Sequence, residues 1–176
     1  IMPSLVGSEM CIRDRYLSID TISGNCTEKG YEDWIMLDSF SLGVSNMLTS
    51  NAGNSERTSG GVQISEMNCS KTMDVSSLLL AEACAGNKNL GEVTLTVTRT
   101  DGDEQLELVN YVMSDAMISS VQTSGSGHGD LPGESFSINF TAINATYTKQ
   151  KPEGTAEGTA NFSWDMKTRE NKSAGG

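Results

Sequence analysis

The residues that could do chemistry in this chain are few and lie far apart. Its single histidine, His128, sits in the glycine-rich stretch "GSGHGD", with no second histidine and no nearby cysteine to complete a zinc site. A general base or metal ligand is one interpretation of His128, and a solvated loop residue is the simpler one. No serine lies in a G-x-S-x-G elbow, so a hydrolase would depend on this one histidine as its base. The inventory argues against an enzyme.

Two further stretches resemble ligand-binding motifs but fail in their context. The glycine spacing of one stretch, with Gly125, Gly127 and Gly129, resembles that of a phosphate-binding loop. Such a loop needs a helix N-terminus after it, but here a proline and a strand pattern follow. The acidic stretch "DGDE" from Asp101 lacks the ligand spacing of a calcium loop and is typical of a hairpin turn. We therefore expect no metal and no cofactor.

Tryptophan side chains raise a second class of function, a secreted glycan-binding β-sandwich. Trp34 and Trp164 could stack against sugar rings. Trp164 alternates with Phe162 and Met166, which predicts that it faces the core. With ten aromatic residues (four Phe, four Tyr and two Trp) in the whole chain, an exposed stacking row is hard to supply.

The totals describe one acidic domain. The chain has 176 residues, a net charge of -11 and a pI near 4.4, so phosphate backbones and anionic lipids would repel it. We expect no nucleic acid partner and no membrane insertion, because no apolar run reaches the length of a membrane span. With Cys11 of the amino-terminal stretch excluded, Cys26, Cys69 and Cys84 are an odd, widely spaced set, which favours reduced thiols near the core over a disulfide framework.

The amino-terminal stretch "IMPSLVGSEMCIRDR" differs in character from the rest of the chain. It lacks the basic start and apolar centre of a secretory signal, and it resembles translated sequencing-adapter read-through. We expect residues 1–15 to be a non-native extension, residues 16–172 to form a single domain, and residues 173–176 to be a tail.

Alternation of period two dominates the rest of the chain. "EVTLTVTRT" places Val93, Leu95 and Val97 on one face and threonines on the other, which predicts a strand with one buried and one wet face. Asp101-Gly102 then predicts a hairpin. In residues 134–149, the apolar positions change phase after Phe140 to Ile143, Ala145 and Tyr147, as at a β-bulge.

One segment has helical character. "MDVSSLLLAEACAGN" offers Asp74 and Ser76 as caps, helix formers from Leu78 to Ala85, and Gly86 as a stop. The stretch after Val44, up to residue 61, is polar, glycine-bearing and aperiodic, and is predicted to be a long functional loop. The expected fold is mainly β: a small barrel of antiparallel strands with one short flanking α-helix.

Taken in order, several segments resemble the haemolysin-coregulated protein family, the tube subunits of bacterial type VI secretion. They include "YLSIDTISG", "DWIMLDSFSLGVS", "GGVQISEMNCSKTMDVSSLLLAEACAGN" and "SSVQTSGSGHGDLPGESFSINF". The resemblance covers residues 16 to about 172. It departs from the family pattern in "MDVSSLLL", which lacks the proline that many members have at the helix start.

The resemblance implies a structural protein that catalyses nothing. It implies a homohexameric ring, stacked rings forming a hollow tube, a spike protein, a contractile sheath, and effectors that travel in the lumen. It also implies assembly in the bacterial cytoplasm followed by secretion without a cleaved signal peptide. A phage tail-tube-like protein is the nearest alternative, because that fold is similar.

Site residues are predicted on this basis. In "DSFSLGVS", Phe40, Leu42 and Val44 are expected to pack inside the barrel. Ser39 and Ser41 are expected to face a watery lumen, and the threonine-rich faces of residues 92–100 and 137–141 are assigned to solvent or lumen. The loop after Val44 is expected to join stacked rings, with Asn46, Asn51, Asn54 and Arg57 as its polar contacts.

Overall fold

The structure is a computed structural model that describes residues 13–50, 57–101, 104–125, 127, 131–150 and 156–171. This part of the chain is mainly β with one α-helix, as predicted from the alternation. The elements, in chain order, are β1 (Arg13–Ile19), β2 (Ile35–Met36), β3 (Ser39–Ser41), β4 (Val44–Ser50), β5 (Arg57–Ile64), β6 (Met67–Thr72), α1 (Ser76–Ala85), β7 (Asn89–Asp101), β8 (Glu104–Ser124), β9 (Gly133–Asn139), β10 (Ala142–Gln150), β11 (Ala156–Asp165) and β12 (Glu170–Asn171).

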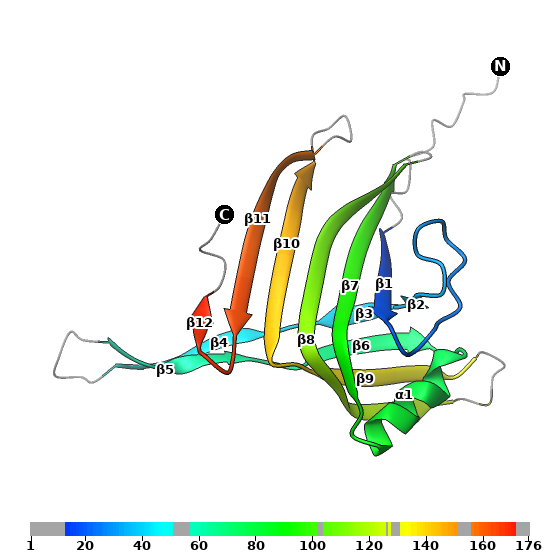
Figure 1. The fold of residues 1–176 in the computed structure, drawn as a ribbon, viewed down its shortest axis with the longest axis horizontal. Helices are drawn as coiled ribbons and strands as arrows, with labels where there is room; N and C mark the ends of the chain where they lie inside the picture. Colours follow the sequence, from blue (N-terminus) through cyan, green and yellow to red (C-terminus); the bar gives the residue numbers. More distant parts are fainter. Residues whose placement is uncertain are drawn as a thin grey trace.

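The strands form two layers that share the long strand β8. The large layer has the order β12-β11-β10-β8-β7-β1-β2, and the small layer joins β3, β6, β9 and residues 117–124 of β8. In Figure 1 the strands of the large layer stand upright, while β3, β6 and β9 run across their lower ends. Every pair is antiparallel. The described strands do not close into the single barrel that the sequence predicted, because β10, β11 and β12 continue the large layer past β8 to an edge at β12.

Two strands bend together where they pass from one layer to the other. Asp115 of β8 adopts a left-handed φ of 51°, and residues 140–141 separate β9 from β10. The Thr141 backbone N–H donates to the Ser114 carbonyl oxygen at 3.0 Å, and its hydroxyl donates to Asp115 Oδ2 at 3.0 Å. The predicted phase change after Phe140 falls at this corner, as a break between two strands.

The core lies between the two layers and beneath α1. The predicted inward positions of β7 and β9 are buried, whereas on β10 Ile143 is buried and Tyr147 is 49% exposed. Large apolar side chains with almost no exposure come from eight elements: Leu17, Ile35, Met67, Leu80, Leu95, Met113, Phe136, Ile138 and Ile143. The period-two prediction is confirmed for β7 and β9, and on β10 only for its first apolar position, Ile143.

The prediction of a wet threonine face on β7 is wrong. Thr96 and Thr98 are 1% and 0% exposed, because the segment after β1 folds over that face. Tyr31 from this segment stacks on Tyr16 with ring centroids 4.3 Å apart. Gln105 Nε2 donates to the Tyr16 hydroxyl at 2.9 Å and to Thr98 Oγ1 at 3.2 Å, so the buried hydroxyls keep hydrogen-bond partners.

The predicted helix is confirmed as α1, but its N-cap residue is Val75 and not Asp74 or Ser76. Asp74 Oδ1 accepts a hydrogen bond from the Ser76 N–H at 2.8 Å, and the Gly86 N–H donates to the Glu82 carbonyl oxygen at 2.9 Å. Leu80 and Ala83 are its buried apolar side chains. Among the described residues, no helix is long and apolar enough to span a membrane.

Two segment boundaries differ from the sequence-based expectation. β1 begins at Arg13, inside the segment treated as an extension, because Arg13, Asp14 and Arg15 pair in register with β7. The predicted loop after Val44 is instead an antiparallel hairpin, β4–β5. The hairpin is joined by backbone pairing and by a hydrogen bond from the Ser45 hydroxyl to the Gln63 carbonyl oxygen. Its sequence has no apolar alternation, so the strand pattern did not predict it.

Candidate functional site

One face of the small layer is lined by small polar side chains. Successive strand residues point to opposite faces, and the face away from the core holds Ser39 and Ser41 of β3, Asn68, Ser70 and Thr72 of β6, Ser135, Ser137 and Asn139 of β9, and Ser120, Gln122 and Ser124 of β8. We call this set the polar face. Ser39 and Ser41 are both exposed, as their predicted role requires.

Side chains on the polar face bond to one another across the strands. The Ser39 and Ser70 hydroxyl oxygens lie 2.6 Å apart. The Ser137 hydroxyl donates to Asn68 Oδ1 at 2.7 Å, and the Ser120 hydroxyl donates to Ser137 Oγ at 3.1 Å. The face is therefore a hydroxyl and amide surface on which several groups bond to one another across the strands.

A carboxylate stands at one end of the polar face. Glu66 Oε2 accepts from the Ser119 hydroxyl at 2.8 Å, and Glu66 Oε1 accepts from Asn139 Nδ2 at 3.0 Å. Ser119 reaches it because the β8–β9 register shifts between Ile118 and Ser120, as at a bulge. Sequence spacing did not reveal Glu66, because its partners come from distant strands.

The small layer has an unpaired edge on each side. β3 pairs with β6 alone, and residues 118–124 of β8 pair with β9 alone, among the strands described. Their outward backbone groups can accept another strand. The polar face thus ends on both sides in edges that can be extended.

The β4–β5 hairpin projects from the body of the molecule, on the left of Figure 1. Val44, Met47 and Leu48 are 55%, 62% and 57% exposed on it. The prediction that Val44 packs inside the barrel is therefore wrong, whereas Phe40 and Leu42 do pack against the core. A two-stranded hairpin is marginally stable without further cover. Asn46, predicted as a contact residue, is exposed in β4, and Arg57 begins β5. Asn51 and Asn54 lie outside the described residues.

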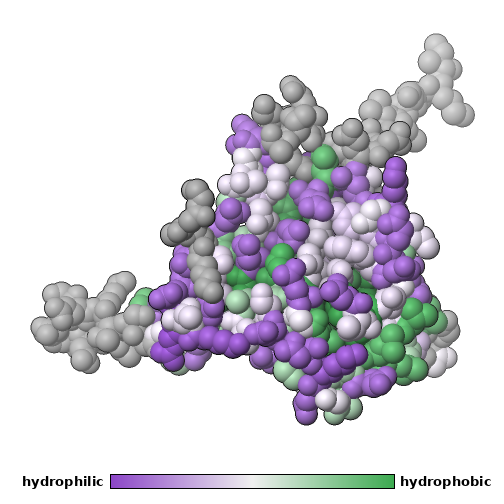
Figure 2. Space-filling view, in the orientation of Figure 1, coloured by the Kyte–Doolittle hydropathy of each residue, from purple (hydrophilic) through white to green (hydrophobic). Residues whose placement is uncertain are grey.

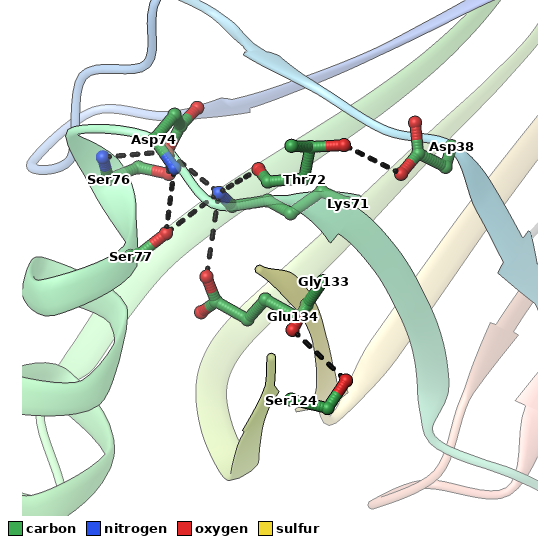
Figure 3. A network of polar contacts seen from close by, with 9 residues as sticks. All are labelled: Asp38, Lys71, Thr72, Asp74, Ser76, Ser77, Ser124, Gly133 and Glu134. Atoms are coloured by element: carbon green, nitrogen blue, oxygen red, sulfur yellow. Dashed lines mark hydrogen bonds and ion pairs between the residues drawn. The ribbon is translucent and has the colours of Figure 1, made fainter. Parts of the chain in front are cut away.

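A buried charged cluster fixes the start of α1 to the small layer. Figure 3 shows the Lys71 ammonium between α1 and β9. Its Nζ lies 2.7 Å from Asp74 Oδ1, 3.0 Å from Ser77 Oγ and 3.6 Å from Glu134 Oε2. Lys71 and Glu134 side chains are both 0% exposed. Burial would raise the pKa of the Asp74 carboxyl, but hydrogen bonds from Lys71 and Ser76 outweigh that effect and lower it.

An apolar patch covers the exposed side of α1. Val75, Leu78 and Leu79 are 60%, 71% and 42% exposed, and Leu131 is 71% exposed. The Met73 N–H donates to the Pro132 carbonyl oxygen, which holds the chain next to Leu131 beside the helix start. Figure 2 shows hydrophobic atoms gathered over α1 at the lower right. We call these four residues the helix patch; such surfaces commonly mark contact sites.

The residues singled out for chemistry do not come together. His128 lies outside the described residues, and Trp164 is half-buried against the core, as predicted. Trp34 packs edge-on against Tyr31, with centroids 5.1 Å apart. Burial raises the pKa of the Cys69 thiol to about 12, which keeps it protonated. In the described part of the chain, no three His, Cys, Asp or Glu side chains gather as metal ligands.

Known proteins share both the sequence pattern and the fold. A family model described as "Type VI secretion system effector, Hcp" matches residues 16–147. The chain is 28% identical over 107 residues to Protein hcp1 of Pseudomonas aeruginosa, and the match covers 60% of this chain and 66% of that protein.

Solved structures superimpose over nearly the whole chain. A structure titled as a type six secretion system protein has a TM-score of 0.86 at 26% identity, covering 92% of this chain and all of the other. Hcp1 from Salmonella typhimurium has a TM-score of 0.74 at 23% identity, covering 92% and 99%. At that identity the second comparison shows the fold alone. The matched family model spans most of the chain, and this chain therefore belongs to the Hcp family of type VI secretion.

Proposed function

We propose that this chain is a structural subunit that closes into homohexameric rings, which stack into the hollow tube of a type VI secretion system. The observation that supports this most directly is the polar face with an unpaired edge on each side. Copies joined edge to edge would line a continuous passage with serine and asparagine side chains.

Edge pairing also explains how an exposed sheet avoids aggregation. An unpaired edge is open to any other strand, whereas a closed ring covers both edges in every copy. The two edges belong to different strands, so each contact is heterologous, and rotation must bring the last copy back to the first. The helix patch supplies a second, apolar surface that a neighbour can cover.

The proposed lumen is chemically passive. Ser39 and Ser41 lie on a face of serine, threonine, asparagine and glutamine side chains, several of which bond to one another. A passing polypeptide would therefore meet no large apolar side chain among them. Effectors could move through it without strong capture. The spike protein, the contractile sheath and the effectors would be partners of the assembled tube, which forms in the bacterial cytoplasm and is then expelled.

The hairpin β4–β5 is the proposed contact between stacked rings. It leaves the body, exposes Val44, Met47 and Leu48, and includes Asn46 and Arg57. Replacing residues 46–62 with a short glycine linker should leave rings intact and remove stacks, as seen by electron microscopy. An unfolded variant, or unchanged stacks, would count against this role.

Ring formation is tested by negative-stain imaging with light scattering of the purified chain. Six-membered annuli are expected, and a strict monomer at high concentration would overturn the proposal. Ser41→Trp tests the lumen: rings should persist while co-purification of an effector falls. Loss of rings in this variant would place Ser41 in the core or at an interface. Lys149→Trp, at an exposed position on β10, is the matched control.

A further inference from the structure

The polar face has a carboxylate, Glu66, at one end and no described lysine or arginine. This negative charge indicates which ligands the face could bind. We propose that Glu66 makes the polar face a binding site for cationic segments, namely lysine or arginine side chains of a passenger polypeptide. The proposal rests on the proposed function, because it concerns what passes along that face.

Glu66 is held in one orientation. The Ser119 hydroxyl and the Asn139 amide donate to its two carboxylate oxygens at 2.8 and 3.0 Å, from β8 and β9. A carboxylate has about four lone-pair sites, so two accepted bonds leave room for a cationic donor. Since the Glu66 carboxylate is already fixed, its side chain would lose little further conformational entropy when a ligand binds.

Among the described residues, Glu66 forms no ion pair with a lysine or arginine. Other described carboxylates do: Glu134 pairs with Lys71, Asp115 with Lys167 and Glu157 with Lys149. Glu66 takes part in none of these pairs. The other acid at this face, Asp38, accepts from the Thr72 hydroxyl at the far end. No described lysine or arginine side chain belongs to the polar face, so its charge is negative only.

Repetition would strengthen a weak site. One exposed ion pair contributes little, but a ring would place one Glu66 per copy around the same passage, and a flexible basic segment could contact several in turn. Like charges would at the same time repel acidic segments. The face would therefore sort passengers by charge while its hydroxyl surface stays non-adhesive.

The test uses the full chain and a short labelled peptide that alternates lysine with serine. Fluorescence anisotropy should show binding that weakens with salt, and Glu66→Gln should reduce affinity by about two- to fivefold. Glu82→Gln, which removes the same charge from exposed α1, should bind like the parent. A second variant, Glu66→Lys, should lose the basic peptide and gain a matched glutamate–serine peptide.

The outcomes are separable from those of the ring proposal. Unchanged binding by Glu66→Gln, or equal binding of acidic and basic peptides by the parent, would overturn the role of Glu66 while light scattering still reports rings. If the chain proves monomeric, ring formation fails, yet a difference between Glu66→Gln and Glu82→Gln would still support the site. Equal behaviour of those two variants would overturn it.

Discussion

Lys71 is the single cation of a buried cluster that includes two carboxylates. Its Nζ bonds to Asp74 and Ser77 and to the Thr72 carbonyl oxygen, while neither oxygen of Glu134 has a hydrogen-bond partner. Removing one partner of a buried pair leaves an uncompensated charge, which is more costly than the pair is favourable. The cluster therefore holds the start of α1 against β6 and β9.

Lys71→Met should destabilise the fold by about 3–5 kcal/mol, measured by urea unfolding. Adding Glu134→Leu to this variant should recover part of the loss, because the orphaned carboxylate is then gone. Lys167→Met, in the exposed pair with Asp115, is the control and should leave the midpoint nearly unchanged. If Lys71→Met alone were as stable as the parent, the buried pair would not be what holds the helix start in place.

Asp74 should make the start of α1 sensitive to acid. Its pKa is lower in the folded state than in the unfolded chain, so its contribution is complete above the unfolded value and is lost as pH falls through the folded one. Asp74→Asn should reduce stability by about 1–2 kcal/mol at neutral pH. Urea melts at successive pH values should show this gap closing below about pH 4, and a constant gap would contradict the assignment.

At the scale of elements, α1 has two roles on two sides. Leu80 and Ala83 attach it to the core, while Leu78 and Leu79 point out with Val75. Leu78 is 71% exposed, so its replacement should change monomer stability by less than about 0.5 kcal/mol. An effect of this residue would therefore report on association.

Leu78→Glu should shift purified protein from rings toward monomers, because it places a charge in an apolar contact. Size-exclusion chromatography with light scattering measures the shift, and circular dichroism checks that the fold persists. Leu78→Met keeps the apolar volume and should assemble like the parent. If Leu78→Glu formed normal rings, the helix patch would not be part of the ring interface.

At the scale of the whole molecule, charge opposes assembly. Each chain has a net charge of -11, and bringing copies together adds repulsion that salt screens over about 10 Å at 0.1 M. Sedimentation velocity should show a larger fraction of rings as the salt concentration rises from low to physiological values. Unchanged or reduced assembly would mean that specific ion pairs across the interface outweigh the net repulsion.

Much of the fold could be predicted from local patterns. Alternation in "EVTLTVTRT" predicted the buried face of β7, and the caps and stop signal predicted α1, because both depend on neighbours in sequence. The predictions failed where distant segments meet. Thr96 and Thr98 are buried under a segment that begins at the end of β1, and no property of β7 itself indicates that cover.

The sequence by itself determined the mainly β class, the helix, the family resemblance and the polar character of Ser39 and Ser41. The tertiary structure alone decided that the layers share β8 without closing a barrel, and that β4–β5 is a hairpin. It also decided that Glu66 meets Ser119 and Asn139. The physical reason is that alternation fixes which face a side chain takes, whereas strand pairing, bends and bulges fix which distant side chains it meets.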